Sequence, residues 1–175
     1  MANAMFGLGR QHFANGDISW PSANIKFVFA STTYTPSINT DEFLSDVPGG
    51  AVVATSGNLA SKTNVLGTVD AADVTVTAVS GSQISYVVIY KDTGTGSTSP
   101  LILLIDTATN LPVTPNGGDI TVQWDNGSNK IFTLFEGLAP KDAPRFLDWL
   151  KGVVGIPAER DGSGLWIPTP NIVAA

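Results

Sequence analysis

The chain has 175 residues and no cysteine, so thiolate metal sites, thiol nucleophiles and disulfide scaffolds are excluded. Its 9 basic and 15 acidic residues give a net charge of −6, which disfavours binding to bare nucleic acid or to an anionic membrane surface. Only 14% of the residues are charged, against roughly 25% in a typical soluble domain. So few charges indicate a surface partly covered by neighbouring subunits, and we expect a homo-oligomer or a larger assembly.

The chain shows no signal for entering or crossing a membrane. No stretch approaches the roughly 20 continuous apolar residues of a membrane-spanning helix. The start, MANAMFGLGRQHF, lacks the basic leader and the long apolar core of a secretory signal. We therefore expect a protein that is made and used without crossing a membrane by that route and that has no membrane partner.

The first 48 residues predict three segments of different structure. Residues 1–24 show no sustained period of 2 or 3.6, which predicts an extended N-terminal arm. NIKFVFAST, at 24–32, is rich in β-branched and aromatic residues and predicts a strand. NTDEFLSDVP, at 39–48, predicts a short helix capped by Asn39 or Thr40 and stopped by its proline.

Residues 25–136 predict one β domain. Beyond residue 50, short apolar or alternating segments follow one another with turn residues between them: AVVAT, NVLGTV, DVTVTAV, QISYVVIY, PLILLID, DITVQW and KIFTLF. Their connections are too short for parallel crossovers. The domain is therefore mainly β, and we expect an antiparallel β-sandwich or barrel of about seven to eight strands. Leu101–Ile105 is apolar on both faces and predicts a central strand.

Two stretches predict hairpins. VVIYKDTGTGSTSPLILLID, at 87–106, places ten polar and small residues between two apolar runs. A phosphate-binding loop is a poor interpretation of it, because the motif glycines are incomplete and a strand follows instead of a helix. We expect a hairpin with a flexible tip. DITVQWDNGSNKIFTLF predicts a second hairpin, in which residues 125–129 turn 120–124 back against 130–135.

The C-terminal part predicts a helix and a tail. Residues 137–155 carry apolar side chains at helical spacing and predict one helix. Residues 156–175 are broken by prolines and predict an extended tail. The tail carries an apolar patch at Leu165, Trp166 and Ile167.

No motif in the sequence predicts catalysis. The single histidine, His12, lies in the irregular arm, and no G-x-S-x-G elbow is present. The acidic residues are spread over turns, so we expect no catalytic residue, no cofactor and no metal site. A carboxylate pair for glycoside cleavage stays open, because such pairing is spatial. A sugar-stacking platform of Trp20, Trp124 and Trp166 stays open as well.

Three segments between Asp70 and Phe135 carry a family resemblance: DAADVTVTAVSG, VVIYKDTGTGSTSPLILLID and LPVTPNGGDITVQWDNGSNKIF. They resemble small virion-associated structural proteins of tailed bacteriophages, encoded near the capsid gene. The resemblance implies a non-enzymatic virion protein that is assembled in the host cytoplasm. Its first interpretation is a capsid decoration or cement protein on the surface of the major capsid protein shell. The alternatives are a tail or neck component at the head-to-tail connector, and a carbohydrate-binding β-sandwich module.

If the chain works by contact, its ends are the first candidates for partner binding. We predict contacts with the major capsid protein or other virion proteins through Phe6 and Phe13 of the arm and through Leu165, Trp166 and Ile167 of the tail. The alternative for each residue is packing on its own domain.

Overall fold

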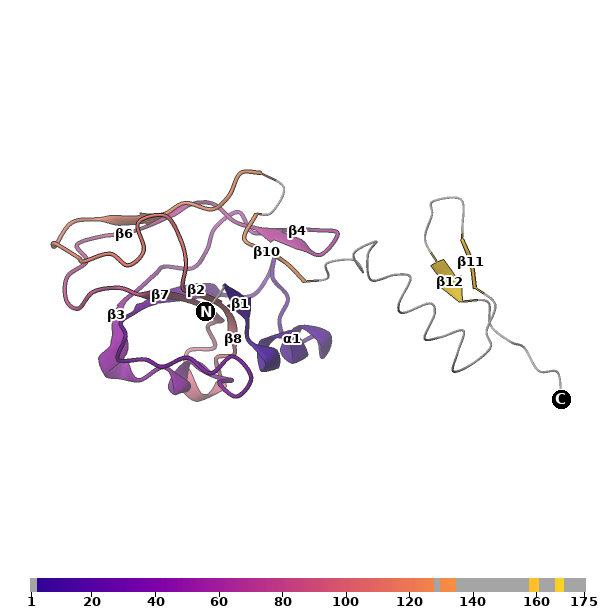
Figure 1. Ribbon diagram of the computed structural model, residues 1–175, viewed down its shortest axis with the longest axis horizontal. Coiled ribbons are helices and arrows are strands. Elements are labelled where there is room, and N and C mark those ends of the chain that lie inside the picture. Colours follow the sequence, from indigo (N-terminus) through magenta and orange to yellow (C-terminus); the bar gives the residue numbers. More distant parts are fainter. Residues whose placement is uncertain (1–2, 128–129, 135–157, 161–165, 169–175) are drawn as a thin grey trace. The chain divides into compact units, whose positions relative to one another are not determined.

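The computed structural model describes residues 3–127, 130–134, 158–160 and 166–168. The chain divides into two compact units, Met1–Leu134 and Phe135–Ala175. The first unit is mainly β and has one short α-helix near its start (Figure 1). Its sheets are antiparallel and, over the residues described, do not close into a barrel.

The largest sheet has five strands in the order β1-β8-β7-β2-β3. A three-stranded sheet has the order β10-β5-β4, and β6 pairs with β9. The bounds are β1 (Ala4–Met5), β2 (Ile25–Ala30), β3 (Val52–Thr55), β4 (Thr63–Val65), β5 (Thr68–Asp70), β6 (Val74–Val76), β7 (Tyr86–Lys91), β8 (Leu101–Ile105), β9 (Ile120–Val122) and β10 (Phe132–Thr133). The helix is α1 (Gly7–Ala14), and single 3₁₀ turns are η1 (Leu44–Asp46), η2 (Gly49–Ala51) and η3 (Gly96–Thr98).

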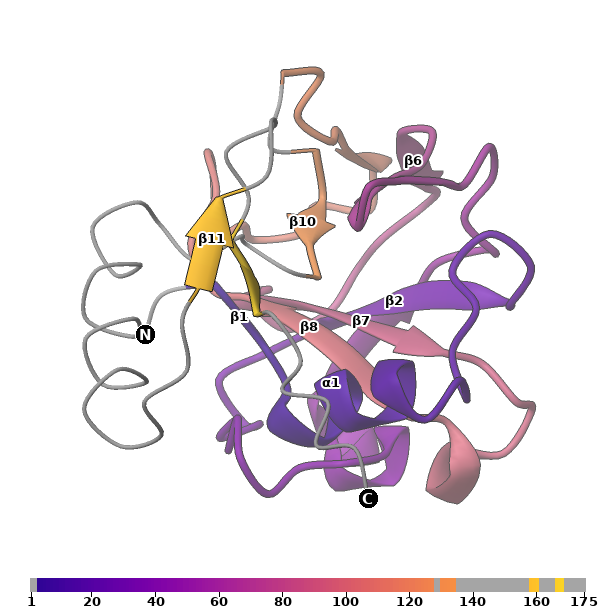
Figure 2. The same ribbon diagram turned by 90° about the vertical axis from the view of Figure 1, so that its right-hand side faces the viewer.

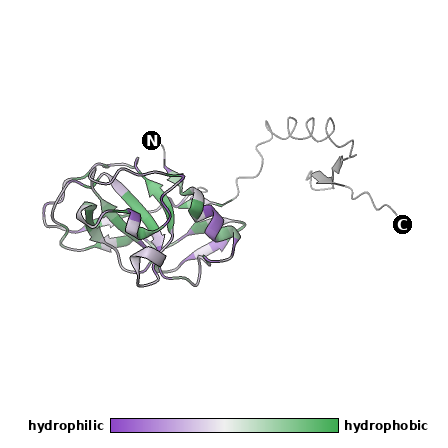
Figure 3. Cartoon of the chain, turned by 90° about the horizontal axis from the view of Figure 1, so that it is seen from below, coloured by the Kyte–Doolittle hydropathy of each residue, from purple (hydrophilic) through white to green (hydrophobic). Residues whose placement is uncertain are grey.

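The five-stranded sheet is covered on both faces. Alternation along β2 sends Phe27 and Phe29 into one cluster and Val28 and Ala30 into the other. The first cluster includes residues of the smaller sheets and the adjoining loop, namely Val69, Val76, Trp124 and Phe132. The second includes Phe6, which lies between β1 and α1, and Tyr34, Val47 and Ala51, which lie between β2 and β3. Figure 3 shows the apolar strands at the centre. The prediction that Leu101–Ile105 is a strand covered on both faces is confirmed.

The N-terminal segment is part of this core and forms no extended arm. β1 pairs with β8, and α1 follows it beside the same strand (Figure 2). The N-terminal segment binds β8 at a bulge. Ile89 of β7 pairs with Leu103 and Tyr90 with Leu101, which leaves Ile102 as an extra residue in β8. The Ile102 carbonyl accepts a hydrogen bond from the Phe6 N–H at 3.0 Å. A helix of eight residues with two glycines is too short for a visible helical period, which explains the wrong expectation.

The hairpin predicted for residues 120–135 is wrong. β9 pairs with β6, and β10 pairs with β5, so the two segments lie in different sheets. The two strands that they pair with, β5 and β6, follow each other closely in the chain. Trp124, two residues after β9, is fixed to the connection between β5 and β6: its backbone N–H donates to Asp73 Oδ1 at 2.9 Å and its indole N–H to the Ala72 carbonyl at 3.1 Å.

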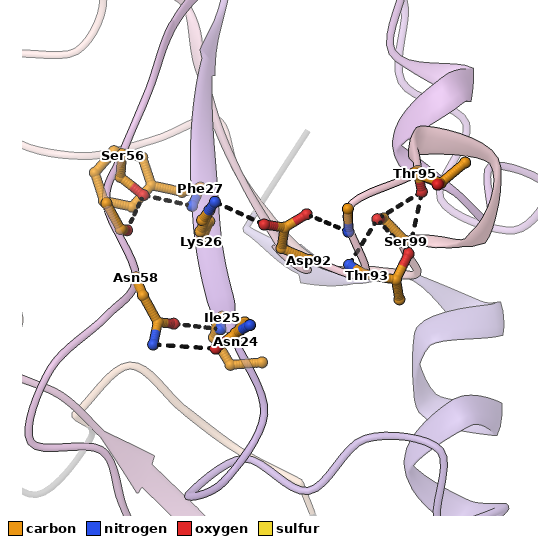
Figure 4. A network of polar contacts seen from close by, with 12 residues as sticks. Asn24, Ile25, Lys26, Phe27, Ser56, Asn58, Asp92, Thr93, Thr95 and Ser99 are labelled. Carbon is orange, nitrogen blue, oxygen red and sulfur yellow. Dashed lines mark hydrogen bonds and ion pairs between the residues drawn. The ribbon is translucent and has the colours of Figure 1, made fainter.

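The hairpin predicted for residues 87–106 is confirmed as β7 and β8. Its tip is dense in hydrogen bonds (Figure 4). The Ser99 hydroxyl donates to the Thr95 carbonyl at 2.8 Å and accepts from the Thr93 N–H at 3.1 Å. The Lys26 ammonium pairs with Asp92 at the base of the tip. The tip is therefore a tied loop, and it forms no cradle at a helix N-terminus.

Two further expectations change in detail. The helix predicted at 39–48 shortens to the 3₁₀ turn η1, because Asp46 Oδ2 accepts hydrogen bonds from the N–H groups of Glu42 and Phe43. NVLGTV, expected as one strand, contains the turn between β4 and β5. The predicted helix at 137–155 lies outside the described residues. In the tail, β11 (Ala158–Arg160) pairs antiparallel with β12 (Trp166–Pro168).

Candidate functional site

The β4–β5 hairpin carries the clearest surface feature of the first unit. Among the residues that the structure describes, the exposed large hydrophobic side chains are Val65 and Leu66, with 66% and 97% of their surface accessible. They are adjacent in sequence and lie at the tip, which connects β4 to β5. We call residues 63–68 the tip hairpin. It contains no ionisable side chain.

The backbone of the tip hairpin holds Leu66 in an unfavourable conformation. Leu66 has φ of +52° and Gly67 has φ of +83°. Positive φ at both loop positions is typical of a two-residue hairpin loop, where asparagine and glycine are the favoured residues. A leucine there is strained, because its Cβ crowds the backbone. The Gly67 N–H donates to Asn64 Oδ1 at 3.2 Å and helps to fix the turn. Strain of this kind is common at functional sites.

The tip hairpin stands on a well-anchored strand. Val69 of β5 is fully buried in the first cluster, and β5 pairs with β10 on its other side. The hydroxyls of Thr68 and Thr133 lie 3.0 Å apart across these strands, and Lys130 pairs with Asp70 at 3.2 Å. All three residues of β4 are exposed, and its outer edge has no strand partner among the described residues. The apolar tip is therefore held in place by buried contacts behind it.

His12, the single histidine of the chain, contacts two carboxylates and joins two segments of the fold. His12 Nδ1 lies 2.8 Å from Asp17 Oδ2, and Nε2 lies 3.1 Å from Glu42 Oε1. Its ring also packs on Phe43, with 5.8 Å between ring centroids. A general base needs one ring nitrogen directed at its substrate or nucleophile. Both nitrogens face carboxylates here, so His12 links α1 to the segment before η1.

The buried phenols are not poised for proton transfer at neutral pH. Burial raises the pKa of Tyr34 above its ordinary value, and the hydrogen bond from its hydroxyl to Asp41 Oδ2 at 2.7 Å raises it further. Burial, and then the charge of Asp92, raise the pKa of Tyr90 to about 12.

In the described part of the chain, no group of three or more His, Cys, Asp or Glu side chains could hold a metal ion.

The structure places the predicted contact residues in different settings. Phe6 is 0% exposed and lies in the second cluster. Phe13 is partly buried and packs edge-on against Phe132, with 6.1 Å between ring centroids. These positions favour packing on the protein's own domain. Leu165 lies outside the described residues, and Trp166 and Ile167 belong to β12. Partner binding by these five residues stays a prediction.

A sugar platform built on the tryptophans of the first unit has no free ring face. Trp20 and Trp124 are buried in the first cluster. The Trp20 indole N–H donates to the Asp70 carbonyl at 3.0 Å, and Trp20 stacks edge-on against Phe132. Each tryptophan thus meets the usual need of a core indole for a hydrogen-bond partner.

The tip hairpin is the candidate that sequence reasoning misses. NVLGTV alternates enough to predict one strand, and the Leu-Gly pair inside it is a weak turn signal compared with Asn-Gly.

No family model matches the chain, and the search of curated proteins found no match. None of the described helices has the length and apolar character needed to cross a membrane.

Proposed function

We propose that the chain is a non-enzymatic structural subunit of a tailed-phage virion that decorates the capsid by binding the shell of major capsid protein. The observation that carries the proposal is the tip hairpin, an uncharged apolar projection on an anchored strand. The low charged fraction of the chain supports a role in subunit contact. The resemblance of the stretch Asp70–Phe135 to virion-associated proteins supports the part of the proposal that assigns the protein to a virion.

In this proposal the domain is a β-sandwich scaffold, and the chemistry is burial of apolar surface. Fully burying a Val or Leu side chain contributes about 1.5–3 kcal/mol. Association costs about 4–15 kcal/mol in lost freedom, so one tip in one pocket holds weakly. A decoration protein offers the same contact many times over a symmetric shell, and linked weak contacts become strong collectively.

The proposal is tested by locating the protein on intact particles by cryo-electron microscopy. We expect density on the outer shell and a copy number that scales with the number of capsid subunits. Density confined to the neck or tail, with the copy number of a connector ring, would replace the capsid role by the connector role. Absence from purified particles would overturn both.

A binding assay links the location to the tip hairpin. Particles prepared without the protein are mixed with purified wild type, with Leu66→Asn or with Ser82→Asn, and are then sedimented. Ser82 is exposed in the segment before β7, outside the tip hairpin, and serves as the matched control. We expect Leu66→Asn to co-sediment at least several-fold less than the wild type, and Ser82→Asn to match the wild type. Equal binding of all three would remove the tip hairpin from the proposal.

A further inference from the structure

Three asparagines in the described part of the chain are followed directly by glycine: Asn15, Asn116 and Asn126. An Asn-Gly pair can lose ammonia, because the glycine nitrogen, with no side chain beside it, can attack the side-chain carbonyl carbon of the asparagine. All three asparagines are exposed, so access of water does not separate them. What separates them is the acceptor to which each glycine N–H donates.

Two of the attacking nitrogens donate to backbone carbonyls. The Gly16 N–H donates at 3.1 Å to a carbonyl in the last turn of α1. The Gly117 N–H donates to the Val79 carbonyl at 2.9 Å, and Asn116 Oδ1 accepts from the Gly118 N–H at 3.0 Å. A backbone carbonyl oxygen accepts a hydrogen bond but is too weak a base to take up the proton. Attack at either site must therefore first break these hydrogen bonds.

The third pair has a carboxylate on the attacking nitrogen. Asp125 Oδ1 accepts the hydrogen bond from the Gly127 N–H at 2.9 Å. A carboxylate within hydrogen-bond distance of a proton can act as its general base. The Asn126 side-chain amide makes no hydrogen bond to any residue that the structure describes, so it is able to turn toward this nitrogen. The loop therefore places base, electrophile and nucleophile in three consecutive residues.

We propose that Asn126 is a site of spontaneous deamidation and that Asp125 promotes the reaction as its general base. The Gly127 nitrogen gives its proton to the Asp125 carboxylate and forms a bond to Asn126 Cγ. The bond from Cγ to Nδ2 breaks, and the proton passes on to the departing ammonia. Water then opens the resulting five-membered succinimide ring at either of its carbonyls, which leaves aspartate or isoaspartate at position 126. Water is the co-reactant, and ammonia is the leaving group.

The modification changes both the charge and the main chain of this loop. Each event adds one carboxylate next to Asp125. In the isoaspartate product the main chain passes through the side-chain carbon and grows by one CH₂, and the former backbone carbonyl becomes a carboxylate. That carbonyl accepts a hydrogen bond from Lys130 Nζ at 3.2 Å, and the same ammonium pairs with Asp70 at 3.2 Å. The new charge therefore competes with Asp70 for Lys130 in the segment before β10.

Peptide mapping by mass spectrometry tests the site in the purified full-length protein, held at neutral pH and physiological temperature. We expect deamidation at Asn126 to be at least several-fold faster than at Asn116 or Asn15. The same protein unfolded in guanidinium is the control, because unfolding removes the hydrogen bonds and should bring the three rates close together. Equal rates in the folded protein would overturn the proposal. A ranking that persists unchanged after unfolding would overturn it as well, because the fold would then not be its cause.

The variant Asp125→Asn isolates the base. An amide oxygen at this position can accept the same hydrogen bond from the Gly127 N–H, but it cannot take up the proton. We expect Asp125→Asn to slow deamidation at Asn126 at least several-fold and to leave the other two asparagines unchanged. Asp119→Asn is the matched control, because Asp119 also accepts a backbone N–H, that of Ala78 at 3.0 Å, and should leave the rate at Asn126 as in the wild type. An unchanged rate in Asp125→Asn would overturn the proposal. These measurements use the purified protein alone, so their outcome is independent of the proposed place on the virion.

Discussion

The ammonium of Lys26 lies 2.6 Å from Oδ2 of Asp92 and ties β2 to the residue that follows β7 (Figure 4). The Gly94 N–H donates to the other carboxylate oxygen at 2.9 Å. The hydrogen bond from Lys26 and the one from Gly94 hold the pKa of Asp92 below its usual value. This pair closes the base of the β7–β8 hairpin, beside the hydrogen-bonded tip.

This ion pair predicts a pH dependence of stability. An aspartate whose pKa is lower in the folded state stabilises the fold above its unfolded pKa of about 3.9, and this contribution disappears as the pH falls through the folded value. Asp92→Asn should therefore cost about 1 kcal/mol at pH 7 and flatten the decline at acid pH. Urea unfolding at a series of pH values measures both. A double-mutant cycle with Lys26→Met is the control, and an unchanged acid decline in Asp92→Asn would contradict the assignment.

The close approach of α1 to β8 predicts a sharp difference between two glycines of the same helix. A Cβ at Gly9 would lie 2.3 Å from the Leu101 carbonyl oxygen, a backbone atom that cannot move aside cheaply. A Cβ at Gly7 would meet no atom closer than 3.5 Å. We expect Gly9→Ala to lower the free energy of unfolding by about 1–3 kcal/mol and Gly7→Ala to change it by less than about 1 kcal/mol. Thermal or urea unfolding decides, and equal effects would mean that α1 is not seated on β8.

The burial of Phe6 predicts where its contribution is felt. Phe6→Ala should cost about 3–5 kcal/mol in the isolated protein, because it leaves a cavity in the second cluster. Phe13→Ala should cost less, because Phe13 keeps part of its surface in water. Urea unfolding of both variants separates core packing from partner contact. If Phe6→Ala keeps wild-type stability but loses particle binding, the result would support the prediction that Phe6 contacts a partner.

The sequence indicates the strands of the central sheet well, because their side chains decide their place locally. NIKFVFAST and QISYVVIY carry enough β-branched and aromatic residues to specify β2 and β7, and PLILLID is apolar on both faces because both faces are covered. The sequence does not predict which distant segments pair with each other. Asp-Asn-Gly is a strong turn signal, yet the indole and backbone of Trp124 bind the corner at Ala72 and Asp73, and this tertiary contact separates β9 from β10.

The tip hairpin, which we propose as the contact surface, is not predicted by the sequence for a related reason. A leucine in a sequence can belong to an exposed hairpin loop or to a core strand, and it is the structure that shows Leu66 to be exposed and at positive φ. Phe6 shows the reverse case, because an irregular N-terminal stretch gives no periodic sign that it packs into a core.

The strain at Leu66 gives the last prediction, in which stability and contact change in opposite directions. Asparagine tolerates positive φ and forms with Gly67 the pair that such loops prefer, so Leu66→Asn should raise the free energy of unfolding by about 1 kcal/mol. The same change removes the apolar side chain and should weaken binding to particles. Leu66→Ala is the matched control, because it removes the apolar contact but keeps a Cβ at positive φ, and it should weaken this binding without the gain in stability. Urea unfolding and sedimentation of both variants test this separation. Lower stability of Leu66→Asn would show that the leucine supports the hairpin itself and is not held there for contact.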